Sequence, residues 1–196
     1  ECVTNIVPSK DDAEGWATKF RLLSGRPLDE ANPVLDTELL VPGARGRVAV
    51  MTSPLSPSGL AYAIRRHRDK PWTLPLFIEN NMISPLGAGL LSFLIDGART
   101  ILVAGTRSSG KTSLLGSLMV EIMRKYRIVT IEDTLEMPVD YLRSIGYNIQ
   151  HMKVRSALTS GGVEVSADEG IRTSLRLGDS SLIVGEVRSM EAKALY

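Results

Sequence analysis

The spacing of apolar residues indicates an N-terminal unit that mixes one helix with strands. Trp16, Phe20 and Leu23 recur at helical spacing within residues 11–25, which predicts a helix with these side chains on one face. Residues 46–68 contain two strand-like runs around a turn of Pro, Ser and Gly, which is typical of a hairpin. These elements predict a small α+β domain.

Strands and helices alternate in the rest of the chain. A helix is predicted over residues 84–99, because Ser84 can cap it and Pro85 suits its first turn. The apolar pattern then predicts, in order, a strand at 100–105, a helix at 111–126, a strand at 127–132, a mixed polar stretch at 134–165, a helix at 166–177 and a strand at 181–186. Such alternation is typical of an α/β fold, in which helices cover a parallel sheet.

These patterns predict two domains. We expect a small α+β domain at residues 1–70, a linker at 71–83 and an α/β domain at 84–196. Two prolines within residues 68–75 indicate the linker.

Composition and charge narrow the function classes. The net charge of +1 gives no basic field of the kind that favours nucleic acid. Cys2 is the single cysteine of the sequence, so no internal disulfide can form and a reducing compartment is the simpler interpretation. The longest apolar stretches, such as residues 86–95, are too short to span a bilayer, and no signal-peptide pattern opens the chain.

A glycine-rich loop joins the strand at 100–105 to the helix at 111–126. Its sequence fits the pattern G-x-x-x-x-G-K-[ST], in which backbone N–H groups and the helix dipole bind phosphate. Lys111 can reach the β- and γ-phosphates, and the Thr112 hydroxyl can bind Mg²⁺. The alternative is a Gly/Ser-rich turn that matches by chance. The predicted nucleotide-binding residues are Gly105, Thr106, Arg107, Ser108, Ser109, Gly110, Lys111, Thr112 and Ser113.

Acidic residues follow two of the predicted strands. Glu132 and Asp133 come at the end of the strand at 127–132, Glu136 lies nearby, and Glu186 ends the strand at 181–186. Ligands of α/β sheets lie beyond the carboxyl ends of the strands, which favours a role in Mg²⁺ binding or water activation. The alternative is that these acids only solubilise the starts of loops.

The order of three segments resembles the type II/type IV secretion ATPases, the hexameric motors of secretion, pilus and archaellum machines. The segments are GTRSSGKTS, IEDTLE and LRLGDSSLIVGEVR, and the resemblance covers about residues 20–196. The stretch at 137–157 is similar to the archaeal branch. The resemblance implies a RecA-like P-loop NTPase core after a small α+β N-terminal domain. Because the family's histidine box and further strands should follow Glu186, we expect the core to be truncated there.

The resemblance also implies roles for individual residues. Residues 105–113 would be the Walker A loop, and Glu132, Asp133 and Glu136 the aspartate box, with Glu132 a candidate general base. Glu186 would be the Walker B acid, which holds Mg²⁺ with Thr112 directly or through water. The sequence cannot divide the base role between Glu132 and Glu186.

Arginines of the N-terminal domain would contact the nucleotide phosphates in such a family member. The candidates are Arg45, Arg47, Arg65 and Arg66, and Arg65 is included in the predicted nucleotide site. Arg172 and Arg176, one helical turn apart, match further arginines of the family. The alternative for both groups is a solvated surface. His67 and His151 do not occupy the position of the histidine box, and each is expected to be a surface or half-buried side chain.

The sequence therefore predicts an ATPase that uses ATP and Mg²⁺ in a homo-oligomeric, hexameric ring. The ring would work in the cytoplasm on a membrane platform protein, powering protein export or pilin assembly, with no nucleic acid expected. One alternative is a RecA-like nucleic-acid motor, which stimulation by DNA rather than lipid would favour. The other is an assembly subunit that binds ATP without turnover. The sequence does not identify the transported substrate.

Overall fold

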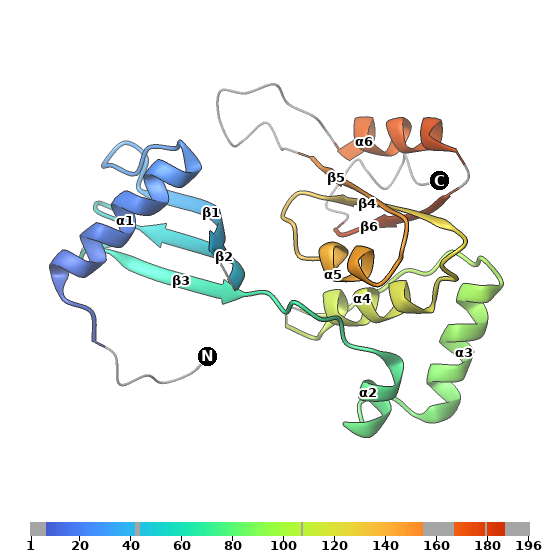
Figure 1. The fold of residues 1–196 in the computed structure, drawn as a ribbon. Coiled ribbons are helices and arrows are strands. Elements are labelled where there is room, and N and C mark those ends of the chain that lie inside the picture. The colour runs from blue at the N-terminus through green and yellow to red at the C-terminus, as the bar shows by residue number, and fades with distance from the viewer. Residues whose placement is uncertain (1–6, 42–43, 107, 155–166, 179, 187–196) are drawn as a thin grey trace. The chain divides into compact units, whose positions relative to one another are not determined.

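A computed structural model of the chain describes residues 7–41, 44–106, 108–154, 167–178 and 180–186. The chain forms two compact units, residues 1–67 and residues 68–196, which are coloured blue to cyan and green to red in Figure 1. Within the described parts, no helix is both long enough and apolar enough to cross a membrane.

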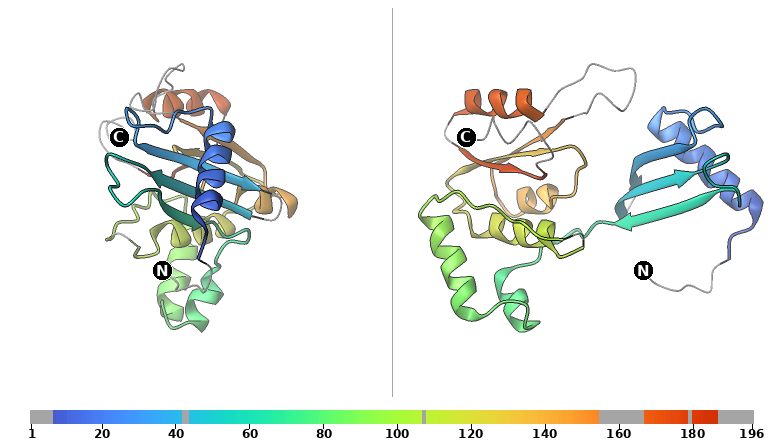
Figure 2. Two further views of the ribbon diagram at one scale, coloured as in Figure 1. Left: turned by 90° about the vertical axis from the view of Figure 1, so that its left-hand side faces the viewer. Right: turned by 180° about the vertical axis from the view of Figure 1, so that it is seen from behind.

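The first unit is a three-stranded antiparallel sheet with one helix on one of its faces, as Figure 2 shows from two sides. Its elements are α1 (Lys10–Ser24), β1 (Val34–Val41), β2 (Ala44–Met51) and β3 (Ala61–Arg66), with the strands in the order β1-β2-β3. The β2–β3 pair confirms the predicted hairpin, whereas β1 is an element that the sequence analysis did not identify.

Helix α1 forms where the sequence predicts a helix, but only part of its predicted apolar face is buried. It begins at a capping box, in which Ser9 and Asp12 exchange hydrogen bonds that also lower the pKa of Asp12. Ala17 and Phe20 are buried in the core, whereas Leu23 is 67% exposed although it lies on the same side of the helix as Phe20. The core of the unit consists of Ala17, Phe20, Leu28, Leu35, Val48 and Val50.

Gly46 lies where β2 and β3 approach most closely. A Cβ atom at this position would lie 2.7 Å from the backbone oxygen of Arg65. Because the strand backbone cannot yield as a side chain would, we expect Gly46→Ala to destabilise the unit by about 1–3 kcal/mol. Chemical denaturation followed by Trp16 fluorescence in a Trp72→Phe background measures this change.

Gly15 provides the matched control for that substitution. It lies in α1, and a Cβ there would meet no atom within 4 Å. Gly15→Ala should therefore leave stability unchanged or raise it by up to about 1 kcal/mol, since alanine favours helices. Equal stability of Gly46→Ala and Gly15→Ala would contradict the close approach of the two strands.

The second unit confirms the predicted α/β class with a parallel sheet of order β5-β4-β6. The central strand β4 is buried from its second residue onward, as expected of a strand with neighbours on both edges. The elements are α2 (Leu74–Glu79), α3 (Pro85–Asp96), α4 (Lys111–Glu121), β4 (Arg127–Glu132), α5 (Val139–Ser144), β5 (Ile149–Lys153), α6 (Ala167–Ser174), a 3₁₀ turn (Leu175–Leu177) and β6 (Ser180–Val184).

Side-chain alternation along β4 divides the core of this unit into two layers. Ile128 packs with residues of α4 and α5, such as Met119 and Leu142. Val129 and Ile131 point to the other face and pack with Ile171 of α6. Glu132, an even-numbered residue of β4, therefore belongs to the face that α4 and α5 cover.

Two predicted features of this unit are wrong. Residues 100–105 form no strand, although Ile101 and Val103 are partly buried and Leu102 is 81% exposed, as in a strand. The apolar alternation is present, but the segment has no ladder partner within the described residues. The polar stretch at 134–165 includes α5 and β5, which sequence analysis did not find because both are short and β5 carries Gln150, His151 and Lys153.

Helix α3 begins at its predicted cap, and the predicted linker contains a helix. Ser84 accepts a hydrogen bond from the Gly87 N–H at 3.0 Å and so caps α3 as expected. The predicted linker at 71–83 contains α2, which Thr73 caps and whose Leu74 packs with Ala88. The helix predicted at 111–126 ends at Glu121 in α4.

Candidate functional site

The glycine-rich loop turns tightly before α4. Ser108 and Gly110 have positive φ angles of 61° and 85°, and the Ser109 N–H donates to the Thr106 oxygen at 3.3 Å. A Cβ at Gly105 would lie 2.7 Å from the Ser109 Oγ, so a larger residue at this position would force the Ser109 side chain to move. Arg107 lies outside the described residues.

Lys111 and the start of α4 give the loop its positive character. The Lys111 Nζ donates to the Thr106 backbone oxygen at 2.7 Å, which places the ammonium group over the loop. Gly110 is the N-cap of α4 and supplies no side-chain hydrogen bond. Because the first N–H groups of a helix have no intrahelical partner, this end of α4 suits an anion such as phosphate.

A cavity of about 190 Å³ adjoins the loop. Its walls are largely apolar and come from α2, from the residues that follow α2 and from the start of α4. A largely apolar cavity of this kind is suited to an uncharged, flat group. The lining residues are Phe77, Met82, Ile83, Val103, Ala104, Ser109, Gly110, Lys111 and Leu114.

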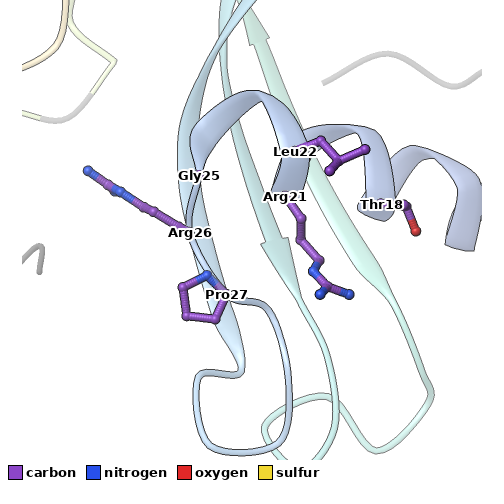
Figure 3. Close-up of a pocket in the computed structure, with 6 residues that line it drawn as sticks. All are labelled: Thr18, Arg21, Leu22, Gly25, Arg26 and Pro27. Carbon is purple, nitrogen blue, oxygen red and sulfur yellow. The ribbon is translucent and has the colours of Figure 1, made fainter.

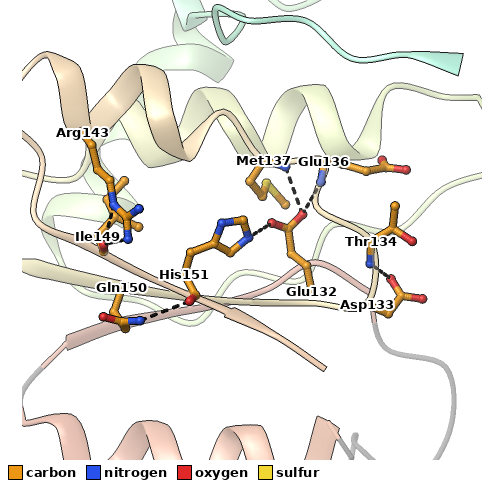
Figure 4. Close-up of polar contacts among 9 residues, drawn as sticks. All are labelled: Glu132, Asp133, Thr134, Glu136, Met137, Arg143, Ile149, Gln150 and His151. Atoms are coloured by element: carbon orange, nitrogen blue, oxygen red, sulfur yellow. Dashed lines mark hydrogen bonds and ion pairs between the residues drawn. The ribbon is translucent and has the colours of Figure 1, made fainter. Parts of the chain in front are cut away.

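Glu132 occupies the centre of a buried polar network at the end of β4 (Figure 4). Its side chain is only 3% exposed. One carboxylate oxygen, Oε1, accepts the backbone N–H groups of Glu136 and Met137, each at 3.0 Å. The other, Oε2, lies 2.7 Å from the Nε2 of His151 on β5. Both oxygens of this candidate base therefore make hydrogen bonds within the protein.

Glu186 differs from Glu132 in being exposed. It follows β6 by two residues, as the sequence analysis expects of an acid after this strand. The Gly185 N–H donates to the Ile131 oxygen at 2.8 Å, and a Cβ at Gly185 would lie 3.0 Å from the Glu132 Cγ. The ends of β4 and β6 thus meet closely, and Glu132 packs beside the residue that precedes Glu186.

His151 is the residue of this network that sequence reasoning missed. The sequence analysis expected a surface or half-buried side chain, and His151 is half-buried, with 13% of its side chain exposed, but its pairing with Glu132 was not expected. A signal was available in principle, because a polar residue within a short strand beside β4 is unusual. It required knowledge of the parallel pairing in which His151 lies opposite Thr130. His67 is half-buried directly after β3.

Strand register sorts the candidate arginines of the first unit by face. Arg45 and Arg47 alternate with Gly46 and Val48 on β2, so they lie on the face that α1 leaves uncovered. Arg65 is paired with Arg47 and shares that face, whereas Arg66 is paired with Gly46 and lies on the opposite one.

Two of the candidate arginines pair with acidic side chains. Arg47 binds both carboxylate oxygens of Asp36, with its Nε at 2.9 Å from Oδ1. Arg172 on α6 pairs with Asp168 at 3.0 Å and is largely exposed, as the alternative of a solvated helix face predicts.

A second hollow, of about 260 Å³, lies at the end of α1 in the first unit (Figure 3). Its lining residues are Thr18, Arg21, Leu22, Gly25, Arg26 and Pro27. The side chains of Arg21 and Arg26 point away from each other, and the Arg26 Nη1 donates to the Asp36 backbone oxygen at 2.9 Å. The two arginine side chains of this hollow therefore do not converge on a common point.

Acidic, histidine and cysteine side chains do not gather in groups of three or more that could hold a metal within the described residues. A magnesium ion at a loop of this type takes most of its ligands from nucleotide phosphates and water. The hydroxyl of Thr112, the second residue of α4, is compatible with such a site.

Comparison with known proteins covers nearly the whole chain. The family model described as "Type II/IV secretion system protein" matches residues 13–195. An uncharacterized protein of Methanocaldococcus jannaschii is 32% identical over 201 residues, which cover 99% of this chain and 27% of that protein. The type IV secretion system protein PtlH of Bordetella pertussis is 28% identical over 203 residues, which cover 93% of this chain and 58% of that protein.

Two further matches have similar extent. A putative conjugal transfer protein of Mycobacterium tuberculosis is 28% identical over 178 residues, covering 89% of this chain and 49% of that protein. The crystal structure of the VirB11 ATPase from the Brucella suis type IV secretion system, in complex with sulphate, matches 94% of this chain and 57% of that chain at 22% identity and a TM-score of 0.43.

These proteins are longer than the chain, which spans 27–58% of the curated relatives named above. The family match extends over both compact units and includes the phosphate loop and both acidic segments. It confirms the resemblance drawn from the sequence motifs. The chain therefore belongs to the family of type II/IV secretion system proteins.

Proposed function

We propose that the chain is part of an ATP-hydrolysing motor subunit of a type II secretion or type IV pilus-like system. The reaction converts ATP and water to ADP and phosphate. The observation that carries this proposal is the phosphate loop. Its closed turn, the Lys111 ammonium over it and the uncapped start of α4 together suit a polyphosphate.

In this proposal the loop and its neighbours bind different parts of the nucleotide. Backbone N–H groups of residues 105–113 bind the phosphates, and Lys111 neutralises the charge that develops on them. Thr112 would hold magnesium, Glu186 would act on the ion only through water, and the ion would supply further charge neutralisation. The apolar cavity beside the loop receives the nucleobase, with Phe77 and Met82 among its walls.

Glu186 is the better candidate for the residue that activates water. A general base must offer an oxygen within reach of the attacking water. Both oxygens of Glu132 are occupied by hydrogen bonds within the protein, three in all, and so are poorly placed to accept a proton from water. Glu186 is exposed at the carboxyl end of β6, where ligands of such sheets bind. We assign the base role to Glu186 and a supporting role to Glu132.

We propose that the motor works as a homo-oligomeric, hexameric ring at the cytoplasmic face of a membrane platform protein. Lipid vesicles should then stimulate hydrolysis, whereas single-stranded DNA should not. Stimulation by DNA alone would favour the nucleic-acid motor, and tight ATP binding without hydrolysis would favour the assembly subunit.

Replacing Glu186 tests the proposed reaction directly. We expect Glu186→Gln to lower kcat for Mg²⁺-dependent ATP hydrolysis by roughly 10²–10⁴-fold, since a general base is lost, and to leave ATP affinity nearly unchanged. Phosphate release at saturating ATP and calorimetric binding measure the two quantities. Glu79→Gln, at an exposed glutamate of α2, is the matched control. Parental turnover in Glu186→Gln would refute the assigned base.

A further inference from the structure

We infer that His151 is a positioning residue for ATP hydrolysis, and this inference rests on the proposed function. Its imidazole fixes the carboxylate of Glu132, which in turn holds the acidic segment at 133–137 at the end of β4. The contact joins two strands of the sheet, and Figure 4 shows the imidazole pointing at the carboxylate.

The pair is built by the parallel register of β4 and β5. Thr130 lies opposite His151, and Glu132 is two residues further along β4, so all three side chains point to the same face of the sheet. The His151 Nε2 lies 2.7 Å from the Glu132 Oε2, and the side chains are 13% and 3% exposed. An ionised carboxylate only accepts hydrogen bonds, so Nε2 must carry the proton that it donates.

Glu132 in turn holds the segment that follows it by hydrogen bonds. Its Oε1 accepts the N–H groups of Glu136 and Met137, which pins the turn after β4 to the end of the sheet. That turn carries Asp133 and Glu136, the remaining acids of the segment. If the carboxylate of Glu132 rotates, the turn loses two of its hydrogen bonds and the two acids lose their fixed place.

Gly185 closes the carboxylate in from the neighbouring strand. A Cβ there would lie 3.0 Å from the Glu132 Cγ, so the Glu132 side chain occupies the space that glycine leaves open. The side chain is therefore confined by β6 on one side and by His151 on the other. Removing the His151 side chain therefore takes away the hydrogen bond that holds Oε2 of Glu132 in place.

Two amide substitutions at position 151 differ only in reach and form a matched pair. The amide nitrogen of glutamine takes nearly the place of the imidazole Nε2, whereas that of asparagine takes nearly the place of Nδ1. His151→Gln should therefore keep the hydrogen bond to Glu132, and His151→Asn should lose it. Both remain polar, so the difference between them isolates the contact from the general cost of changing a buried side chain.

The experiment measures local amide exchange and turnover on the same proteins. In His151→Asn we expect faster deuterium uptake in peptides covering residues 133–138, and a kcat that is lower by between roughly tenfold and a hundredfold at unchanged ATP affinity. His151→Gln should match the parent in both measurements. Circular dichroism establishes that each variant is folded. Should His151→Asn fail to fold, Glu132→Gln provides the second test, because the loss of the carboxylate should raise uptake in the same peptides.

The outcomes separate this inference from the proposed function. The inference is overturned if deuterium uptake at residues 133–138 equals that of the parent in both His151→Asn and Glu132→Gln. It is also overturned if uptake is faster in His151→Asn while kcat stays at the parental value. Equal losses of kcat in His151→Gln and His151→Asn also overturn it, because a merely structural histidine would behave in this way. If the parent hydrolyses no ATP but the exchange pattern is as expected, the proposed function fails while the anchoring of the 133–137 segment by His151 stands.

Discussion

Lys111→Ala is expected to weaken ATP binding by about 10–100-fold, the equivalent of one lost charge-assisted hydrogen bond to phosphate. The Lys111 Nζ lies over the loop, 2.7 Å from the Thr106 oxygen, where a β- or γ-phosphate would replace that contact. Isothermal titration calorimetry with a non-hydrolysable ATP analogue and Mg²⁺ measures the change.

Lys125→Ala is the matched control for this prediction. Lys125 is an exposed lysine of the same unit, outside the loop, with its Nζ 4.9 Å from the centre of the Tyr126 ring. Its removal should leave ATP affinity within about twofold of the parent, since a distant surface charge is screened by salt. Equal affinities of Lys111→Ala and the parent would remove the observation on which the proposed function rests.

Arg65→Ala is expected to lower kcat far more than ATP affinity, up to roughly 10³-fold if the guanidinium stabilises the transferring phosphoryl group. Arg65, Arg45 and Arg47 share the face of the sheet that α1 leaves uncovered, and we propose that at least one of them contacts the nucleotide phosphates. Steady-state hydrolysis and ATP binding are to be measured for the three single Arg→Ala variants.

Arg66→Ala is the control that the strand register supplies. Arg66 is the next residue on β3 but lies on the opposite face, so its removal should leave kcat near the parental value. Mixing variant and parental subunits tests whether the contact is made by a neighbouring subunit of the proposed ring. If the site is shared between subunits, the rate of ATP hydrolysis of the mixture should lie above or below the sum expected for independent subunits. Parental turnover in all three variants would end the proposal for these arginines.

Features fixed by neighbouring residues were predictable from the sequence. The helix caps are of this kind, because Ser84 and Gly87 meet within one turn of α3. The glycine-rich loop is another, since Gly105 faces the Ser109 side chain only four residues away and Gly110 has the positive φ angle that favours glycine. Strand β4 was predicted with its observed bounds, because a run of β-branched residues between charged ends favours one conformation.

Features that depend on pairing between distant segments were decided only by the tertiary structure. The apolar alternation at 100–105 predicts a strand, but a strand also needs a ladder partner, which the described residues do not provide. The helical pattern places Leu23 on the apolar face of α1, but packing against the sheet decides which residues of that face are buried, and Leu23 is exposed.

The candidate site shows the same division. The sequence by itself determined the phosphate loop and the acids after β4 and β6, because motif, strand and helix there are contiguous. It did not determine that Glu132 pairs with His151, 19 residues away, or that Arg65 shares a face with Arg47. Those contacts follow from strand register, and register is selected by burying one whole face of a sheet at once, a property of the assembled core rather than of any local segment.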